Sequence, residues 1–210
     1  MFYLTNKLEF PPVTTSSAEG VVAIGGDLSV ERLLLAYKNG IFPWSENDDF
    51  LLWWSPDPRM VLYPDSLKIS KSLQKKMRTH SFEITHNEAF GEVIRKCADA
   101  KRKGQDGSWI TEGMIEAYET LHQMGIAESV EVWLEGEMVG GLYGVSMKKV
   151  FSGESMFHSV SDASKIAFVH LVEKCKKEQK ELIDCQVYTD HLKSLGAEEI
   201  PRAKFLTYLK

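Results

Sequence analysis

The chain has 210 residues, of which 43% are apolar and 26% charged, and it carries a net charge of −5 at pH 7. This length can bury a core in one large or two small domains, and the composition is typical of a soluble globular protein. Because no apolar run is long enough for a membrane span and no signal pattern opens the chain, we expect a cytoplasmic protein without a membrane partner.

Residues 10–60 are rich in prolines, glycines and aromatic side chains. A single helix is predicted among them, with Ser29 as its N-cap and Gly40 at its end. We therefore expect a small, irregular N-terminal domain over residues 1–60.

From residue 61 onward the pattern changes to a regular alternation of elements. Helices are expected over residues 70–78, from the N-cap Asn87 to Cys97, from the N-cap Thr111 to Gly125, over 162–177 and over 190–195. Strands are expected over residues 82–85, 129–134, 138–145, 150–152 and 182–187, with Glu135-Gly136 as the turn of a hairpin. This order predicts an α+β fold, a mixed sheet with helices packed on it, for a second domain over residues 61–210.

The residues that usually hold metals show no matching pattern. Cys97, Cys175 and Cys185 lie far apart in apolar or helical runs, so we expect buried, reduced thiols. The six histidines are scattered, and Gly25-Gly26-Asp27 lacks the spacing of a nucleotide-binding loop. We therefore expect neither a metal nor a nucleotide cofactor.

The apolar run of residues 182–187 contains a carboxylate and a primary amide, Asp184 and Gln186. Side chains alternate across a strand, so both emerge on the same face, where they can form a hydrogen-bonded pair. A buried carboxylate needs partners or its pKa shifts. The pair is either part of a reaction centre or a polar pair that satisfies itself in the core.

Tryptophans and glycines form a second set of candidates. Trp44, Trp53, Trp54 and Trp109 lie in predicted loops, where flat rings can stack on unpaired bases or form the core of a small domain. The glycines of residues 140–144 fall within a strand, where they favour either a plain bulge or a bend that faces a ligand.

A run of cations opposes the overall negative charge. Five of them lie between Leu67 and His80 without a single carboxylate: Lys68, Lys71, Lys75, Lys76 and Arg78. On a helix, Lys71, Lys75 and Arg78 share one face. This face is either simply solvated or a contact for a phosphate backbone.

Together the motifs of this chain resemble those of the leucyl/phenylalanyl-tRNA-protein transferase family. The matching segments are residues 23–29, 40–44, 53–59, 109–111, 129–133, 139–145, 153–157, 183–186 and 191–197. The resemblance implies a small N-terminal domain and a C-terminal domain related to the acetyltransferase (GNAT) fold. It also implies the transfer of Leu or Phe, and less readily Met, from aminoacyl-tRNA to proteins with N-terminal Arg or Lys, which marks them for degradation.

The resemblance also implies roles for particular residues. Asp184 and Gln186 match the catalytic pair, in which Asp184 would polarise Gln186 and the amide oxygen would orient the attacking amine. The remaining matches are Trp44, Trp109 and Glu154 around the terminal adenosine of the tRNA, Leu142, Phe151 and Ile183 in the aminoacyl pocket, Phe168 and His170-Leu171 in a nearby helix, and Lys71, Lys75 and Arg78 at the acceptor stem. No cofactor is needed, because the ester that links the amino acid to tRNA is already activated.

Two other classes are compatible with parts of the sequence. A coenzyme-A-dependent acyltransferase would carry a basic, glycine-rich loop before a helix, but residues 155–163 contain neither Arg nor Gly. A non-catalytic RNA-binding module would explain the basic run and the tryptophans but not Asp184 and Gln186.

Overall fold

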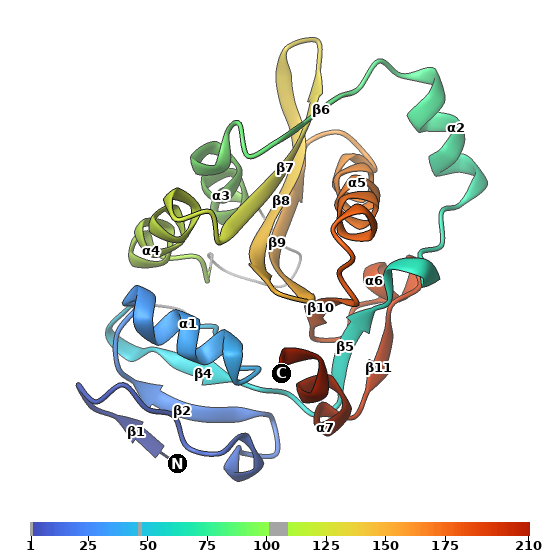
Figure 1. The fold of residues 1–210 in the computed structure, drawn as a ribbon. Coiled ribbons are helices and arrows are strands. Elements are labelled where there is room, and N and C mark those ends of the chain that lie inside the picture. The colour runs from blue at the N-terminus through green and yellow to red at the C-terminus, as the bar shows by residue number, and fades with distance from the viewer. Residues whose placement is uncertain (1, 46–47, 101–108) are drawn as a thin grey trace.

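Two β-sheets organise the chain in the computed structural model, which describes residues 2–45, 48–100 and 109–210 (Figure 1). The smaller sheet has the strand order β1 (Phe2–Leu4), β2 (Val21–Gly25), β4 (Leu52–Trp54) and β3 (Phe42–Pro43). Its first pair is parallel and the other two are antiparallel. The region expected to be irregular thus contains four strands, each too short to produce a clear alternation of apolar and polar residues.

Helix α1 (Val30–Lys38) packs beside the smaller sheet and confirms the predicted helix. Its N-cap is Ser29, whose hydroxyl accepts a hydrogen bond from the backbone N–H of Arg32. Gly40 follows the helix with a φ of +72°, a backbone conformation that glycine adopts without strain.

The larger sheet has seven strands. Their order is β11 (Glu198–Ile200), β5 (Arg59–Leu62), β10 (Leu182–Gln186), β9 (Val150–His158), β8 (Glu137–Met147), β7 (Ala127–Leu134) and β6 (Glu83–His86). All neighbouring strands are antiparallel except β9 and β10, which are parallel. The predicted hairpin is confirmed, because Glu135 and Gly136 form the turn between β7 and β8, both with positive φ.

Helices cover both faces of the larger sheet (Figure 1). The helices α3 (Phe90–Asp99) and α4 (Glu112–Gln123) lie on one face and α5 (Ala163–Lys177) on the other. The remaining helices of this region are α2 (Lys71–Thr79), at the margin, α6 (Asp190–Ser194) and the short α7 (Arg202–Phe205). Successive residues of β8 point to opposite faces, so Leu142 belongs to the core under α5 and Tyr143 to the core under α3 and α4. The mixed α/β fold is confirmed.

Two predicted element boundaries are wrong. Asn87 does not cap α3: the N-cap is Ala89, and the Asn87 side chain instead accepts a hydrogen bond from the backbone N–H of Ser129. Strand β9 does not end at residue 152 but continues to His158, because β8 pairs with it over its full length. All three cysteines are buried and form no disulfide bond, as expected.

The division into domains at residue 60 stays a prediction. The smaller sheet ends at Trp54 and the larger sheet begins at Arg59. The C-terminal segment nevertheless returns to α1, since a Cβ atom built on Gly40 would lie 2.6 Å from Leu206.

The β8–β9 pair contains a bulge that requires glycine. Gly144 pairs with Gly153 and Tyr143 with Ser155, so Glu154 is the extra residue on β9. A Cβ atom on Gly144 would lie 2.2 Å from the Ser152 carbonyl oxygen and 2.6 Å from the Phe151 ring. The glycine-rich segment of β8 therefore lies opposite a bulge, whose extra residue belongs to β9.

We predict that Gly144→Ala lowers the free energy of unfolding by about 1 to 3 kcal/mol, because a rigid strand cannot move away from the added methyl group. Chemical denaturation of both proteins measures the difference. Gly91→Ala is the matched control, since Gly91 lies in α3 and the nearest atom to its added methyl is the flexible end of Glu119. An equal loss of unfolding free energy in Gly144→Ala and Gly91→Ala would contradict the requirement for glycine at residue 144.

Candidate active site

A cavity of about 350 Å³ opens where the parallel strands β9 and β10 separate. The pairing of β9 with β10 ends at Ser152 and Asp184, and the residues that follow on each strand line the cavity. This volume lies within the range of small-molecule pockets. The split between the strands therefore creates room for a ligand at the centre of the sheet.

Two bulges aim side chains across this split. On β10, Cys185 is the extra residue between Asp184 and Gln186, and Gln186 has a φ of +64°. On β9 the extra residue is Glu154. The Gln186 amide nitrogen Nε2 donates to Glu154 Oε1 at 2.9 Å, so the two irregular positions meet.

Asp184 is bound by a buried arginine that the sequence analysis did not assign to the site. Arg59 Nε and Nη2 donate to the two carboxylate oxygens of Asp184 at 2.8 and 2.6 Å. The guanidinium carbon of Arg59 lies 4.7 Å from the centre of the Phe42 ring and 4.7 Å from that of the Phe205 ring. Two facts in the sequence could have indicated this contact. A buried carboxylate needs a cation, and Arg59 ends the matched segment 53–59.

The prediction that the side chains of Asp184 and Gln186 are hydrogen-bonded to each other is wrong. Asp184 Oδ1 accepts the backbone N–H of Gln186 at 2.9 Å, while the Gln186 amide turns to Glu154. The bulge at Cys185 breaks the simple alternation on which the prediction relied. The carboxylate of Asp184 thus binds the backbone N–H of Gln186 and not its side-chain amide.

Glu154 connects Gln186 to two tyrosines. The Tyr118 hydroxyl donates to Glu154 Oε2 at 3.1 Å, and the Tyr37 and Tyr118 hydroxyls lie 2.5 Å apart. Burial away from water raises the pKa of Glu154 to about 7, although the tyrosine hydrogen bonds lower it. Burial also raises the pKa of both tyrosines well above the usual range, so both stay neutral.

The cavity walls are largely apolar, and the predicted pocket residues are divided between the wall and the core. Leu142 and Ile183 line the cavity, as do Phe168 and Leu171 of α5. Phe151 does not line it but lies in the core below. His170 also lies off the wall and faces Glu173, with Nδ1 3.4 Å from its carboxylate. The cavity wall also contains residues to which the sequence gave no site role, among them Phe42, Met156, Thr189, His191 and Leu192.

The four tryptophans expected in loops separate into two groups, and the loop prediction is wrong for Trp53 and Trp54, which lie in β4. Trp44 and Trp109 line the cavity and are partly exposed, whereas Trp53 is fully buried and its ring centre lies 5.0 Å from that of Phe10. Trp54 supports Trp44: its indole N–H donates to the Trp44 carbonyl at 2.7 Å. Trp44 and Trp109 are thus available to a ligand, and Trp53 is a core residue.

The basic run forms α2, and its cations differ in their surroundings. Lys71, Lys75 and Arg78 are exposed, and no carboxylate among the described residues forms an ion pair with them. Lys76 instead contacts the chain just before α5. The described residues contain no cluster of three metal-binding side chains, and none of their helices is long and apolar enough to cross a membrane.

Comparisons with known proteins show the family of this chain. A family model described as leucyl/phenylalanyl-tRNA protein transferase matches residues 61–210, and the model of that family's N-terminal domain matches residues 26–57. The leucyl/phenylalanyl-tRNA--protein transferase of Flavobacterium johnsoniae is 56% identical over 210 residues, which cover all of this chain and 99% of that one. The protein of the same name from Syntrophobacter fumaroxidans is 54% identical over 209 residues, 100% of this chain and 89% of that one. The chain belongs to the leucyl/phenylalanyl-tRNA protein transferase family.

Solved structures resemble the chain less closely. L-PGS from Bacillus licheniformis has a TM-score of 0.47 and 13% identity, with 81% of this chain and 56% of that chain covered. A GCN5-related N-acetyltransferase-like protein from Streptococcus suis has a TM-score of 0.43 and 13% identity, over 85% of this chain and 68% of that chain. Both TM-scores are below 0.5, so neither likeness carries an argument about this chain.

We predict that Glu154 makes stability depend on pH. Between its ordinary pKa of 4.5 and the raised value of about 7, the folded state keeps a proton that the unfolded state releases, so stability falls as pH rises. Glu154→Gln keeps a neutral group at every pH. From pH 4.5 to 8 the variant should therefore gain about 3 kcal/mol relative to the parent protein.

Denaturant unfolding at a series of pH values measures this difference. Glu83→Gln, which removes an exposed carboxylate from β6, controls for the general effect of one charge. A stability difference between Glu154→Gln and the parent that stays constant across the series would show that burial does not raise the pKa of Glu154.

Proposed function

We propose that this chain transfers Leu or Phe, and less readily Met, from aminoacyl-tRNA to the α-amino group of proteins with N-terminal Arg or Lys. The observation that best supports this function is one cavity that combines apolar walls with an oriented amide, Gln186, at its base. The product would carry a new N-terminal residue that marks it for degradation. A cytoplasmic location, where charged tRNA is found, belongs to the same proposal.

The walls suit an apolar side chain of the donor. Leu142, Ile183 and Phe168 supply shape without a hydrogen-bonding group. Discrimination by single methylene groups amounts to about 1 to 3 kcal/mol, which is why Met would also be accepted. Phe151 belongs to the same buried core as these residues and would support the wall from behind.

The partly exposed rings of Trp44 and Trp109 suit the terminal adenosine of the tRNA. Stacking of a base on an aromatic ring contributes about 1 to 3 kcal/mol. Glu154 would lie beside this adenosine, and its hydrogen bond to Gln186 supports a second role, which is to orient the amide. The exposed cations of α2 would contact phosphates of the acceptor stem.

The chemistry is an exchange of an ester for an amide. The α-amino nitrogen attacks the ester carbon, the C–N bond forms, the bond to the ribose oxygen breaks, and the proton lost by the amine ends on that oxygen. An α-amino group has a pKa of about 7.7 to 8.0, so roughly a tenth is neutral near pH 7 and a strong base is unnecessary.

Gln186 would orient the amine through its carbonyl oxygen. Its Nε2 is already committed to Glu154, so the oxygen is the end of the amide left for the amine. Asp184 contributes by fixing the backbone of Gln186 and acts as a positioning residue. Such positioning can supply most of the rate enhancement.

We predict that Gln186→Met lowers kcat for transfer about 100-fold while KM for Phe-tRNA changes little, because the thioether keeps the size of the side chain but cannot orient the amine. The assay follows labelled Phe from Phe-tRNA to a peptide that begins with Arg. Thermal melting checks that the variant folds.

Cys185→Ala is the matched control, since it alters the neighbouring residue of the same bulge and should retain most of the activity. A Gln186→Met variant that folds and transfers Phe at the parent kcat would exclude a catalytic role for Gln186. Label that reaches the peptide from acetyl-CoA, and not from Phe-tRNA, would favour a coenzyme-A-dependent acyltransferase.

We predict that replacing Lys71, Lys75 and Arg78 with Ala raises KM for Phe-tRNA and flattens its salt dependence. Each lost phosphate contact should reduce the slope of log affinity against log salt by about 0.9. Lys38→Ala, which removes an exposed cation from the end of α1, should leave the slope unchanged. An unchanged slope in the triple variant would show that α2 does not contact phosphates.

A further inference from the structure

Helix α2 is attached to the rest of the protein by few contacts. It lies at the margin of the molecule in Figure 1, far from the smaller sheet. Leu73 is its one buried residue, packed into the core that α5 also joins. A helix held in this way is free to move unless polar contacts fix it.

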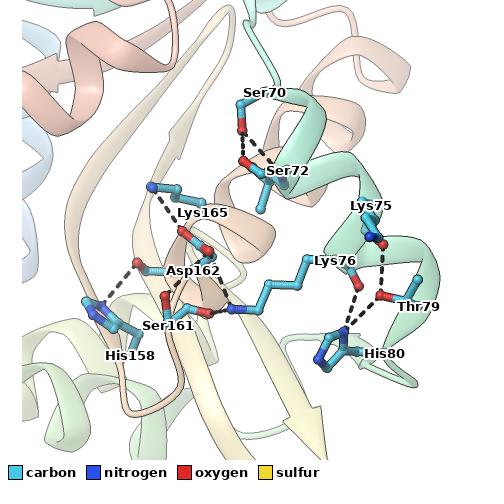
Figure 2. Close-up of polar contacts among 12 residues, drawn as sticks. Ser70, Ser72, Lys75, Lys76, Thr79, His80, His158, Ser161, Asp162 and Lys165 are labelled. Carbon is cyan, nitrogen blue, oxygen red and sulfur yellow. Dashed lines mark hydrogen bonds and ion pairs between the residues drawn. The ribbon is translucent and has the colours of Figure 1, made fainter.

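Among the described residues, Lys76 makes the only side-chain hydrogen bonds that connect α2 to a distant part of the chain. Its Nζ donates to the Ser161 carbonyl at 2.5 Å and lies 3.4 Å from the Asp162 carboxylate (Figure 2). The other polar side-chain contacts of α2 stay within the helix or its ends, such as those of Ser72 and Thr79. The Lys76 side chain is only 21% exposed, whereas Lys75 beside it is exposed.

The segment that Lys76 reaches joins two walls of the cavity. Ser161 and Asp162 connect β9, which contributes Met156, to α5, which contributes Phe168. Asp162 is the N-cap of α5 in the left-handed conformation, with a φ of 67°, and a second lysine, Lys165, binds it at 2.9 Å. The contact of Lys76 with Ser161 and Asp162 therefore connects α2 to the segment between two walls of the cavity.

We propose that Lys76 and Asp162 are positioning residues that tether α2 at a fixed distance from the cavity. The inference rests on the proposed function: the free cations of α2 bind the acceptor stem, and the tether sets where the aminoacyl end of that tRNA arrives. Lys76 therefore acts through Asp162 and does not act as a phosphate ligand. Consecutive lysines of one helix thus have different roles.

Amide hydrogen exchange over residues 71–79 tests the tether in the free protein. Lys76→Met should speed exchange about fivefold, the factor expected for loss of a partly exposed charge pair. Asp162→Asn should speed it less, because the bond of Lys76 to the Ser161 carbonyl remains, and the double variant should be no faster than Lys76→Met. Asn adopts the left-handed conformation readily, so Asp162→Asn keeps the backbone. Lys75→Met and Lys165→Met are matched controls that leave the contact of Lys76 with Asp162 intact. Unchanged exchange in Lys76→Met and Asp162→Asn overturns the tether.

Transfer kinetics test the positioning role. With Phe-tRNA, Lys76→Met and Asp162→Asn should each lower kcat/KM about tenfold. Lys76→Arg, which keeps the charge, should restore it. With phenylalanyl-adenosine, a donor that lacks the stem, both variants should match the parent protein. A phosphate-ligand role for Lys76 predicts the opposite for Asp162→Asn, since removal of a negative charge would leave tRNA binding equal or stronger.

The remaining outcomes also decide the question. Faster exchange with normal Phe-tRNA kinetics overturns the positioning role, and an equal loss with phenylalanyl-adenosine places the defect in the cavity instead. A parent protein that transfers Phe from neither donor refutes the proposed function, while the exchange experiment still decides whether the tether exists.

Discussion

The buried pair of Arg59 and Asp184 is the interaction on which the site depends. Neither charge can stay in the interior without the other, and breaking such a pair costs about 3 to 5 kcal/mol. The pair joins the neighbouring strands β5 and β10, and the guanidinium lies between Phe42 of the smaller sheet and Phe205 of α7. Segments from the N-terminal and C-terminal parts of the chain thus meet at one cation. The position of Asp184 then fixes Gln186, because the same carboxylate accepts its backbone N–H.

The geometry of the cavity follows from where regular pairing stops. Parallel strands β9 and β10 separate after Ser152 and Asp184, and a bulge on each strand turns Glu154 and Gln186 toward each other. Bulges commonly re-aim side chains next to active sites. Glu154 is held in turn by Tyr118, so the amide of Gln186 stands at the end of a fixed line of hydrogen bonds. Gly144 makes this possible, since any larger residue would meet the carbonyl of Ser152.

The sequence predicted the elements that long, periodic patterns define, and it identified Asp184 and Gln186 because a carboxylate and an amide are unusual in an apolar strand. It did not predict how they are held. Arg59 and Tyr118 come from distant segments, and no local pattern shows that they meet Asp184 and Glu154. A bulge also inserts one residue and defeats any argument from alternation, as at Cys185. The strands of the smaller sheet were missed because two to five residues are too few to show a period.

The hydrogen bonds that the buried carboxylates accept have a consequence for selectivity between nucleophiles. An activated ester in a cavity is exposed to hydrolysis wherever a base can take a proton from water. Both oxygens of Asp184 are occupied by Arg59, and those of Glu154 by Tyr118 and Gln186. The Gln186 amide that lines the cavity is far too weak a base to activate water, but in the proposed reaction it would hold an amine that is already neutral. In the proposed reaction, the arrangement would thus protect the aminoacyl bond until a protein N-terminus arrives.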